Sequence, residues 1–310
     1  MPSDKKILCL HRRGYVFNAI VPVLTDVCAR RGWCFREEPQ GKRESLTKPV
    51  SDDLCHDADL IIRGRTGWYP FGMPWPYTPN LDKHFKKVVA LDDADGTGRT
   101  VEHLCAYYLK REYIGDTWQK REKAIPFSMC APRDVVAMEP LPWEDRDIDL
   151  FVSVCFKSGG IREKLVKAAR GVRGFTVVAH GFKTKQDGQF PLGPYTRPNY
   201  LDLLRRSKIA IAPCGKGQDT NTYWEVPACG VALLAERRTI TIANNFAEGE
   251  EALFFETPEE MLEQCVVALQ DQERLKEMAF AGRAKVLKYH TAEKRVETLL
   301  EIAKPILERS

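Results

Sequence analysis

Short apolar runs alternate along the chain with segments whose apolar positions follow helical spacing. Residues 16–30 carry apolar side chains three and four positions apart, which predicts an amphipathic helix that ends before Gly32. The runs on either side of such segments are bounded by charged residues, as buried strands are. Strands separated by helices imply a mostly parallel sheet with both faces covered. The strands predicted in this half are residues 6–10, 33–36, 60–62 and 88–91.

The alternation begins again after residues 129–149, a stretch rich in Pro and acidic residues that is typical of a linker. From residue 258 to residue 309 the pattern is helical. We therefore expect two αβ halves joined by one linker. Strands are predicted in the second half at residues 149–156, 175–179, 208–213 and 231–235, and helices at residues 160–170, 200–207 and 223–229.

Residues 64–80 are crowded with Gly, Pro and aromatic residues, which excludes a helix or a central strand there. A long aromatic loop that follows a strand usually lines a site or forms a lid. Its side chains can stack on a ligand or grip a phosphate, or they can simply pack an inter-domain loop. The candidate ligand-binding residues are Arg63, just before this loop, and Arg65, Trp68 and Tyr69 within it.

Length and composition narrow the class of protein. The 310 residues, 44% of them hydrophobic, suit two globular domains and exclude a disordered chain. The net charge of +4 is too small to indicate nucleic-acid binding by itself. The 10 cysteines include no C-x-x-C pair, which favours buried, reduced thiols over zinc ligands or disulfides. We find neither a signal peptide nor an apolar run that could span a membrane, and we expect a soluble, cytoplasmic protein.

Residues that could bind a ligand are concentrated at positions 213–222, in a turn that follows a predicted strand and precedes a predicted helix. Its glycines allow close backbone approach, and helix N-terminal amides attract anions. Lys216 and the hydroxyls of Thr220 and Thr222 suit a diphosphate, although the spacing is not that of a P-loop. The alternative is a surface loop with a capped helix, because Thr222-x-x-Glu225 matches a capping box.

Residues 200–295 resemble the carboxyl-terminal domain of GT-B glycosyltransferases, most closely the CgeB-like branch. The resemblance rests on a glycine-bearing loop, a Glu-containing helix, an acidic loop and two further helices in the family's order. The amino-terminal half resembles the family only in its αβ alternation and in short fragments. The matching motifs are Glu225, Ala228-Cys229-Gly230, Gly249-Glu250-Glu251, Pro258-Glu259-Glu260, Gly282-Arg283 and His290-Thr291.

The resemblance implies an α/β chain with the GT-B fold, in which two Rossmann-like αβ domains face a central cleft. Residues 1–140 are then the acceptor-side domain and residues 141–291 the nucleotide-sugar-binding domain. Residues 292–310 form a helix that crosses back toward the first domain. Its apolar positions follow helical periodicity, so one face of that helix should be buried.

In such enzymes the second domain binds a nucleotide-sugar donor as a co-substrate, and we expect a UDP-linked sugar here. The resemblance implies no metal and no cofactor. Glu225 would bind the ribose, and the loop from Gly215 to Thr222 would meet the nucleotide and its diphosphate. Cations across from the loop would neutralise the leaving diphosphate, or they would only form a solvated turn. The donor-binding candidates are Lys157, Ser158, Arg162, Gly215, Lys216, Thr220, Asn221, Thr222 and Glu225.

One position departs from the family pattern. Retaining relatives often carry a second acid eight positions before the helix glutamate, where this chain has Gly217, with Asp219 as the nearest acid. Retention or inversion therefore stays open. An inverting reaction needs a general base, and His11, Asp93 and Asp95 lie at predicted strand ends where that base is expected. Asp95 can instead cap the turn before Gly96.

The sequence thus predicts a glycosyltransferase that moves a sugar to an acceptor hydroxyl. The acceptor is either a saccharide or a hydroxymethylated base in DNA. The alternative is a non-catalytic nucleotide-sugar or nucleic-acid binding module on the same fold.

Overall fold

The computed structural model describes residues 4–11, 15–39, 51–65, 82–93, 105–115, 124–156, 160–182 and 195–309. The chain divides into two compact units. Unit 1 contains Met1–Met129, Ile240–Ala243 and Ala292–Ser310, and unit 2 contains Cys130–Thr239 and Asn244–Thr291. The first boundary lies after Met129, whereas the sequence prediction placed it at residue 140.

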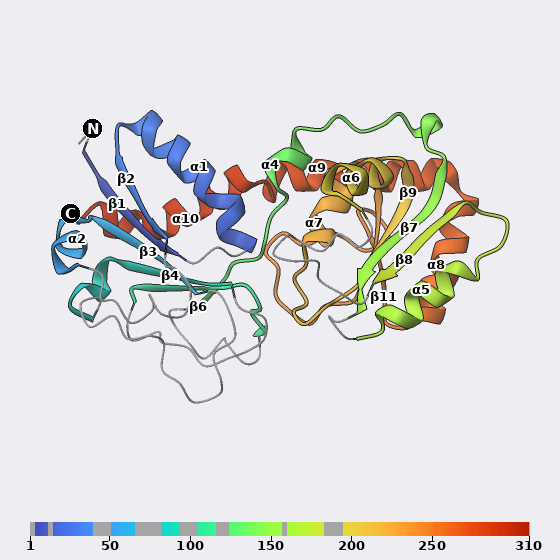
Figure 1. The fold of residues 1–310 in the computed structure, drawn as a ribbon, viewed down its shortest axis with the longest axis horizontal. Coiled ribbons are helices and arrows are strands. Elements are labelled where there is room, and N and C mark those ends of the chain that lie inside the picture. Colours follow the sequence, from blue (N-terminus) through green and yellow to red (C-terminus); the bar gives the residue numbers. More distant parts are fainter. Residues whose placement is uncertain are drawn as a thin grey trace. The chain divides into compact units, whose positions relative to one another are not determined.

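Unit 1 is built on a six-stranded sheet in the order β2-β1-β3-β4-β5-β6, and every pairing in it is parallel (Figure 1). The strands predicted from the apolar runs are present, which confirms the parallel-sheet prediction for this half. β5 and β6 were not predicted, because β5 ends on a lysine and β6 has only three residues. The strands are β1 (Lys6–His11), β2 (Cys34–Pro39), β3 (Leu60–Arg65), β4 (Val88–Asp92), β5 (Tyr107–Lys110) and β6 (Ala124–Pro126).

β3 extends further than the sequence predicted. Gly64 and Arg65 pair with Leu91 and Asp92 of β4 in the middle of the sheet. The prediction that residues 64–80 exclude a central strand is therefore wrong for its first two residues, because a glycine at a strand end is compatible with parallel pairing. Residues 66–80 lie outside the described part of the chain.

Two long helices of unit 1 pack against each other. α1 (Tyr15–Arg31) buries Phe17, Ile20, Leu24 and further apolar residues at helical spacing, as predicted. α10 (Ala292–Leu307) contacts α1 and β3, and it buries one face of mostly apolar residues. The prediction that one face of the helix in residues 292–310 is buried is therefore confirmed. Two short elements, α2 (Asp52–Asp57) and the 3-10 helix η2 (Asp82–Lys87), complete the described helices of this unit.

Unit 2 is built on a five-stranded sheet in the order β11-β10-β9-β7-β8, again with parallel pairings. Its strands are β7 (Ile148–Cys155), β8 (Val177–Phe182), β9 (Ser207–Ala212), β10 (Ala232–Glu236) and β11 (Leu253–Phe255). Its helices are α4 (Arg133–Val136), α5 (Arg162–Arg170), α6 (Arg197–Arg205), α7 (Asn221–Ala228), α8 (Pro258–Gln270) and α9 (Gln272–Tyr289), with the 3-10 helix η4 (Trp143–Asp145).

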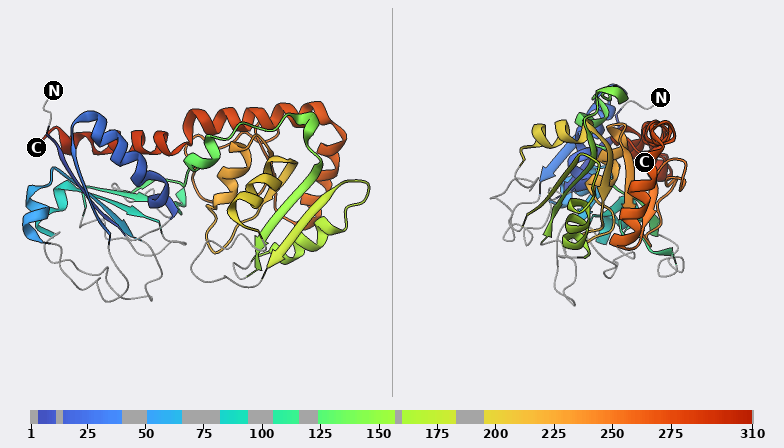
Figure 2. Two further views of the ribbon diagram at one scale, coloured as in Figure 1. Left: turned by 45° about the horizontal axis from the view of Figure 1, so that its top comes forward. Right: turned by 90° about the vertical axis from the view of Figure 1, so that its right-hand side faces the viewer.

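Helices cover both faces of this sheet (Figure 2). Alternate residues of β7 and β9, such as Leu150 and Ile209, share one core with α5, α8 and the start of α9. The next residue along β7, Phe151, points to the opposite face, where its ring packs 5.8 Å from that of Tyr200 in α6. This two-sided cover explains why the strands of unit 2 read as continuous apolar runs.

The segment predicted as a linker is a packed part of unit 2. Trp143 is buried in the unit 2 core, and the guanidinium of Arg146 lies 4.9 Å from its ring. Arg146 also donates to the carbonyl oxygens of Ser207 at 3.1 Å and Gly230 at 2.8 Å. Burial lowers the pKa of Arg146 to about 10. Pro and acidic residues suggested a free linker, but one aromatic and one arginine side chain anchor the segment.

The cysteines carry free thiols, and most of them are buried, as expected from their apolar surroundings. Burial raises the pKa of Cys9, Cys229 and Cys265 to about 12 each, so these thiols stay protonated at neutral pH. Cys34, on the edge strand β2, is exposed.

We expect a thiol reagent such as Ellman's reagent to label Cys34 first in the native protein, because only an accessible thiolate reacts quickly. The buried thiols should react only after unfolding. Mass spectrometry of the labelled peptides measures the order, and early labelling of Cys9 or Cys265 would contradict the packing described.

Within the described residues no helix is both long enough and apolar enough to cross a membrane.

Candidate functional site

A tight loop, residues 213–220, joins β9 to α7 at the carboxyl edge of the unit 2 sheet. The Gly215 amide donates to the Gly217 carbonyl at 2.8 Å, which closes the first turn of the loop. The Cys214 amide donates to the Glu236 carboxylate at the end of β10, also at 2.8 Å. Ligands of open parallel sheets bind beyond such strand ends, so this edge is the natural candidate site.

Arg162, a predicted donor-binding residue, holds one side of the loop. From the start of α5 its Nε donates to the Cys214 carbonyl at 2.7 Å, and its Nη1 donates to the Cys155 carbonyl at 3.3 Å. Burial lowers the pKa of Arg162, since these partners are neutral carbonyls. A Cβ at position 215 would lie 2.8 Å from Nη2 of Arg162, so a larger residue there would displace this guanidinium from its present position.

Arg238 holds the other side of the loop, and the sequence prediction missed it. Its Nε donates to the Gln218 carbonyl at 2.8 Å, and its Nη1 donates to the Glu236 carbonyl at 2.7 Å. Its guanidinium also lies 3.8 Å from the centre of the Tyr223 ring in α7. The sequence offered only its position as a signal, because Arg238 lies two residues after the end of β10.

The start of α7 presents the remaining polar candidates. Thr220 is the N-cap residue, and its hydroxyl accepts from Arg238 at 3.4 Å rather than capping the helix. Asn221 and Thr222 form the half-buried first residues of the helix, and Lys216 is exposed. The capping-box alternative is therefore wrong: Thr222 lies inside the helix, and the Glu225 carboxylate has other partners.

Glu225 is a buried acid with two side-chain partners in unit 2. Its Oε1 accepts from Nη1 of Arg197 at 2.5 Å, and its Oε2 accepts from the Tyr200 hydroxyl at 3.2 Å. Burial opposes the charge on Arg197, but Glu225 and Asp134 outweigh it and raise the pKa of Arg197. Glu225 lies one turn along α7 from Asn221 and Thr222, on the same face of the helix. Neither Arg197 nor Tyr200 was predicted, because no sequence spacing links them to Glu225.

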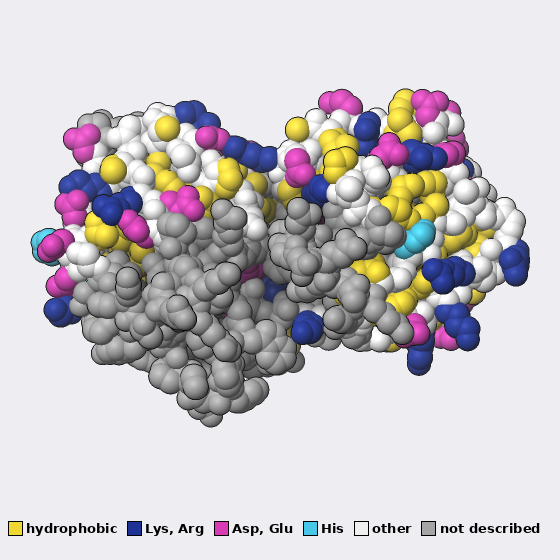
Figure 3. Space-filling model, viewed as in Figure 1, with side chains coloured by type: hydrophobic (Ala, Val, Ile, Leu, Met, Phe, Trp, Pro, Cys, Tyr) yellow, Lys and Arg dark blue, Asp and Glu magenta, His cyan; other side chains and the backbone are white. Residues whose placement is uncertain are grey.

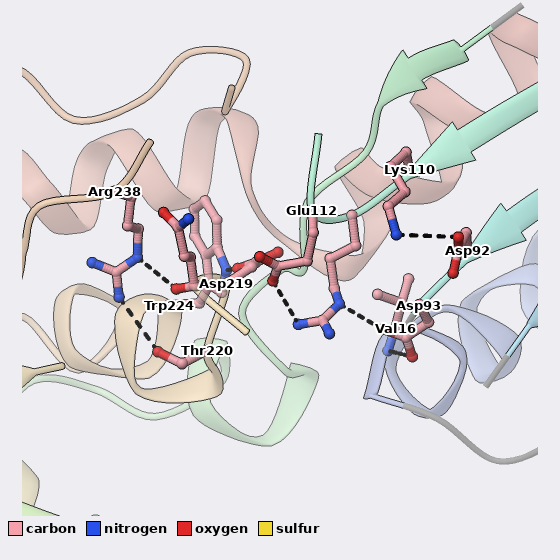
Figure 4. Close-up of polar contacts among 11 residues, drawn as sticks. Val16, Asp92, Asp93, Lys110, Glu112, Asp219, Thr220, Trp224 and Arg238 are labelled. Atoms are coloured by element: carbon pink, nitrogen blue, oxygen red, sulfur yellow. Dashed lines mark hydrogen bonds and ion pairs between the residues drawn. The ribbon is translucent and has the colours of Figure 1, made fainter. Parts of the chain in front are cut away.

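Asp219, the acid nearest to the position where retaining relatives carry one, has a structural partner. Its Oδ1 accepts from the indole Nε1 of Trp224 at 2.7 Å, and its side chain is buried (Figure 4). Trp224 packs 4.6 Å from the ring of His290, whose Nε2 lies 2.9 Å from the Asn244 carbonyl. His290 is buried, and these contacts fit a structural role for its ring.

In unit 1 the carboxyl ends of β4 and β5 carry a buried charge cluster. Asp93 is ion-paired with Arg111 at 3.1 Å, and its Oδ2 accepts from the Val16 amide at 3.0 Å (Figure 4). Arg111 also lies 3.3 Å from the Glu112 carboxylate. The Val16 contact places the Asp93 carboxylate at the start of α1, where the helix dipole favours a negative charge. These contacts favour a structural role for Asp93, which was predicted as a general base.

The other predicted residues of unit 1 are only partly described. Arg63 lies in β3 with a half-buried side chain. His11 ends β1 and Arg65 ends β3, but their side chains lie outside the described part of the structure. The residues that lie outside it altogether are Trp68, Tyr69, Asp95, Lys157 and Ser158.

The loop, α7 and Glu225 all lie in a segment that matches a known protein family. A family described as glycosyl transferase-like matches residues 162–301. The resemblance to GT-B glycosyltransferases is confirmed at this level, and the CgeB-like branch stays a prediction. A comparison with curated protein sequences gives no match.

Solved structures with the same fold are similar over nearly the whole chain. A glycosyltransferase from Rickettsia africae has 11% identity and a TM-score of 0.65, with 99% of this chain and 100% of that chain covered. Sucrose-phosphate synthase from Thermosynechococcus elongatus has 12% identity and the same TM-score of 0.65, with coverage of 99% and 100%. HepE from Anabaena, in complex with UDP and glucose, has 10% identity and a TM-score of 0.56, with coverage of 97% and 100%.

At these identities the likeness establishes the fold. The α/β prediction of two Rossmann-like domains of the GT-B class is thereby confirmed.

Proposed function

We propose that the chain is a glycosyltransferase that uses a nucleotide-sugar donor, and that unit 2 binds this donor at the carboxyl edge of its sheet. The observation that carries the proposal is the loop at residues 213–220. Arg162 and Arg238 fix this loop from its two sides. It leads directly into α7, where Glu225 lies one turn beyond the first residues. This arrangement falls within the glycosyltransferase-like segment.

The chemistry of this edge suits a nucleoside diphosphate. Backbone amides at a helix start attract phosphate oxygens, and the exposed Lys216 adds a positive charge beside them. A carboxylate has about four acceptor positions, and Arg197 and Tyr200 each occupy one on Glu225. The remaining positions suit the two hydroxyls of a ribose. In this proposal Asn221 and Thr222 contact the nucleotide from the first turn of α7.

The start of α1 in unit 1 is less suited to bind a nucleotide phosphate. The Val16 amide at the start of α1 already donates to Asp93, and a carboxylate at that place repels a phosphate. We therefore assign unit 1 to the acceptor, with Arg63, Arg65, Trp68 and Tyr69 as the proposed acceptor residues. His11 and Asp95 are the proposed candidates for a general base if the reaction inverts.

We propose UDP as the nucleotide because HepE, which has this fold, is described in complex with UDP, with UDP and glucose, and with UDP-glucose. For the acceptor we favour a saccharide over a hydroxymethylated DNA base. On the one face that Figure 3 shows, the described Lys and Arg side chains are interspersed with Asp and Glu rather than gathered in a broad basic patch. A DNA acceptor would instead require such a patch for the phosphates.

The test is a donor screen followed by an acceptor screen. Hydrolysis of UDP-glucose, UDP-N-acetylglucosamine and GDP-mannose is measured first, and transfer to saccharides and to hydroxymethylated DNA second. We expect a UDP-sugar to be consumed and a saccharide to be glycosylated. Tight UDP binding without turnover on any acceptor would favour the non-catalytic binding module. DNA affinity that falls steeply with salt would favour the DNA acceptor.

EDTA should leave turnover unchanged. The proposed site offers amides, hydroxyls and a lysine to the diphosphate. Two acids beside the loop are engaged by the protein, Asp219 by the Trp224 indole and Glu236 by the Cys214 amide. The measurement is the rate of UDP release with EDTA and with added Mn²⁺. Loss of activity in EDTA that Mn²⁺ restores would show that the diphosphate is held by a metal elsewhere.

A further inference from the structure

Arg238 connects three backbone segments that meet at the proposed donor site. Its nitrogens donate to the Ala212 carbonyl at the end of β9, to the Gln218 carbonyl in the loop and to the Glu236 carbonyl at the end of β10. The distances are 3.3, 2.8 and 2.7 Å respectively. One side chain therefore ties the beginning and the end of the loop to the neighbouring strand.

The contacts of Arg238 continue into α7. Its Nη2 lies 3.4 Å from the Thr220 hydroxyl, and its guanidinium stacks on the Tyr223 ring at 3.8 Å. The Tyr223 hydroxyl donates in turn to the Asn245 side chain at 2.5 Å. Burial raises the pKa of Tyr223, although the Arg238 charge acts in the opposite direction. The side chain that stacks on Arg238 is thus itself fixed.

Only a guanidinium can make this set of contacts. It is a planar fork with five N–H donors, whereas a lysine ammonium is a single point that cannot reach three diverging carbonyls. Because the C=O and N–H of a trans peptide point in opposite directions, fixing the Gln218 carbonyl also fixes the direction of the Asp219 amide. Arg238 therefore determines how the last amides of the loop are aimed before α7 begins.

We propose that Arg238 is a positioning residue for the donor diphosphate: it aims the loop amides at the phosphates and acts through the loop rather than by contact with the ligand. This inference rests on the proposed function, since it assumes that the loop meets a diphosphate. Nε, Nη1 and Nη2 of Arg238 all donate to protein oxygens, which fits a role in support of the loop.

The experiment compares Arg238→Ala and Arg238→Lys with Arg237→Ala. Arg237 is a matched control because it is adjacent and of the same type, but it pairs with Glu248 and Glu256 on the surface. Each protein is titrated with UDP and, in competition, with uridine, which lacks phosphates. We expect both Arg238 variants to bind UDP about tenfold more weakly, with little change for uridine, because several hydrogen bonds that order the loop are lost.

A purely structural role would weaken both ligands alike and would overturn the proposal. Wild-type affinity in Arg238→Lys would also overturn it, because a charge alone would then suffice. Amide hydrogen exchange of residues 214–220 in the ligand-free protein is the second measurement, and it should quicken in the Arg238 variants but not in Arg237→Ala. If the wild type binds no nucleotide, the proposed function fails and so does the diphosphate role, while exchange still decides whether Arg238 orders the loop.

Discussion

Glu225→Gln should weaken UDP binding about ten- to hundredfold, because hydrogen bonds to a charged acceptor contribute about 1.5–3 kcal/mol each. The substitution keeps the shape of the side chain but removes the charge that faces the ribose hydroxyls in our proposal. Arg197 keeps Asp134 as a partner in this variant, since its Nη2 donates to that carboxylate at 3.2 Å. The fold should therefore survive.

Calorimetric titration with UDP and with 2′-deoxy-UDP measures the effect. The loss should be smaller for 2′-deoxy-UDP, which lacks one of the two hydroxyls. Asp134→Asn serves as the matched control, because it removes the other carboxylate from Arg197 and leaves Glu225 in place. Unchanged UDP affinity together with a lower melting temperature in Glu225→Gln would mean that Glu225 is only the structural partner of Arg197.

Asp92→Ala should destabilise unit 1 by about 3–5 kcal/mol, the usual cost of removing one partner of a buried ion pair. Asp92 and Lys110 lie 3.1 Å apart, and both side chains are 0% exposed. The Tyr108 hydroxyl also donates to Asp92. The substitution takes this carboxylate away from a lysine that has no access to water, which makes it the largest expected effect on stability in the described part of the chain.

Denaturant unfolding of the full chain measures this loss. Asp92→Ala combined with Lys110→Met should recover most of it, because an apolar pair often replaces a buried ion pair at little cost. Asp57→Ala is the control: it breaks the exposed pair with Lys6 and should leave stability unchanged. Losses that simply add in the double variant would show that Asp92 and Lys110 do not depend on each other.

Much of the fold was predictable because burial leaves a clear pattern in the sequence. The runs at β1, β4 and β9 are apolar on both faces, and α1 and α10 carry apolar side chains on one face. β5 was not predicted because its buried residues include Lys110. The charge of Lys110 is paired with Asp92 at the end of β4, the neighbouring strand in the sheet. Such a pair is visible only once the strands are assembled.

The candidate site was predictable in part for a similar reason. Glu225, Gly215 and Arg162 were found from their place after strands and from the family resemblance. The contacts that hold them come from residues distant in the chain: Arg197 lies 28 positions before Glu225, and Arg238 lies 20 positions after Gln218. No local pattern records such a contact, because it arises only when the sheet brings strand ends together.

The central claim is that the nucleotide binds at the carboxyl edge of the unit 2 sheet. The most direct test is amide hydrogen exchange of the full chain with and without UDP, read peptide by peptide. Our account predicts that UDP slows exchange in residues 213–228 and leaves exchange at the start of α1 unchanged, since the Val16 amide there is already engaged by Asp93. Slower exchange at the start of α1, with none in residues 213–228, would contradict it.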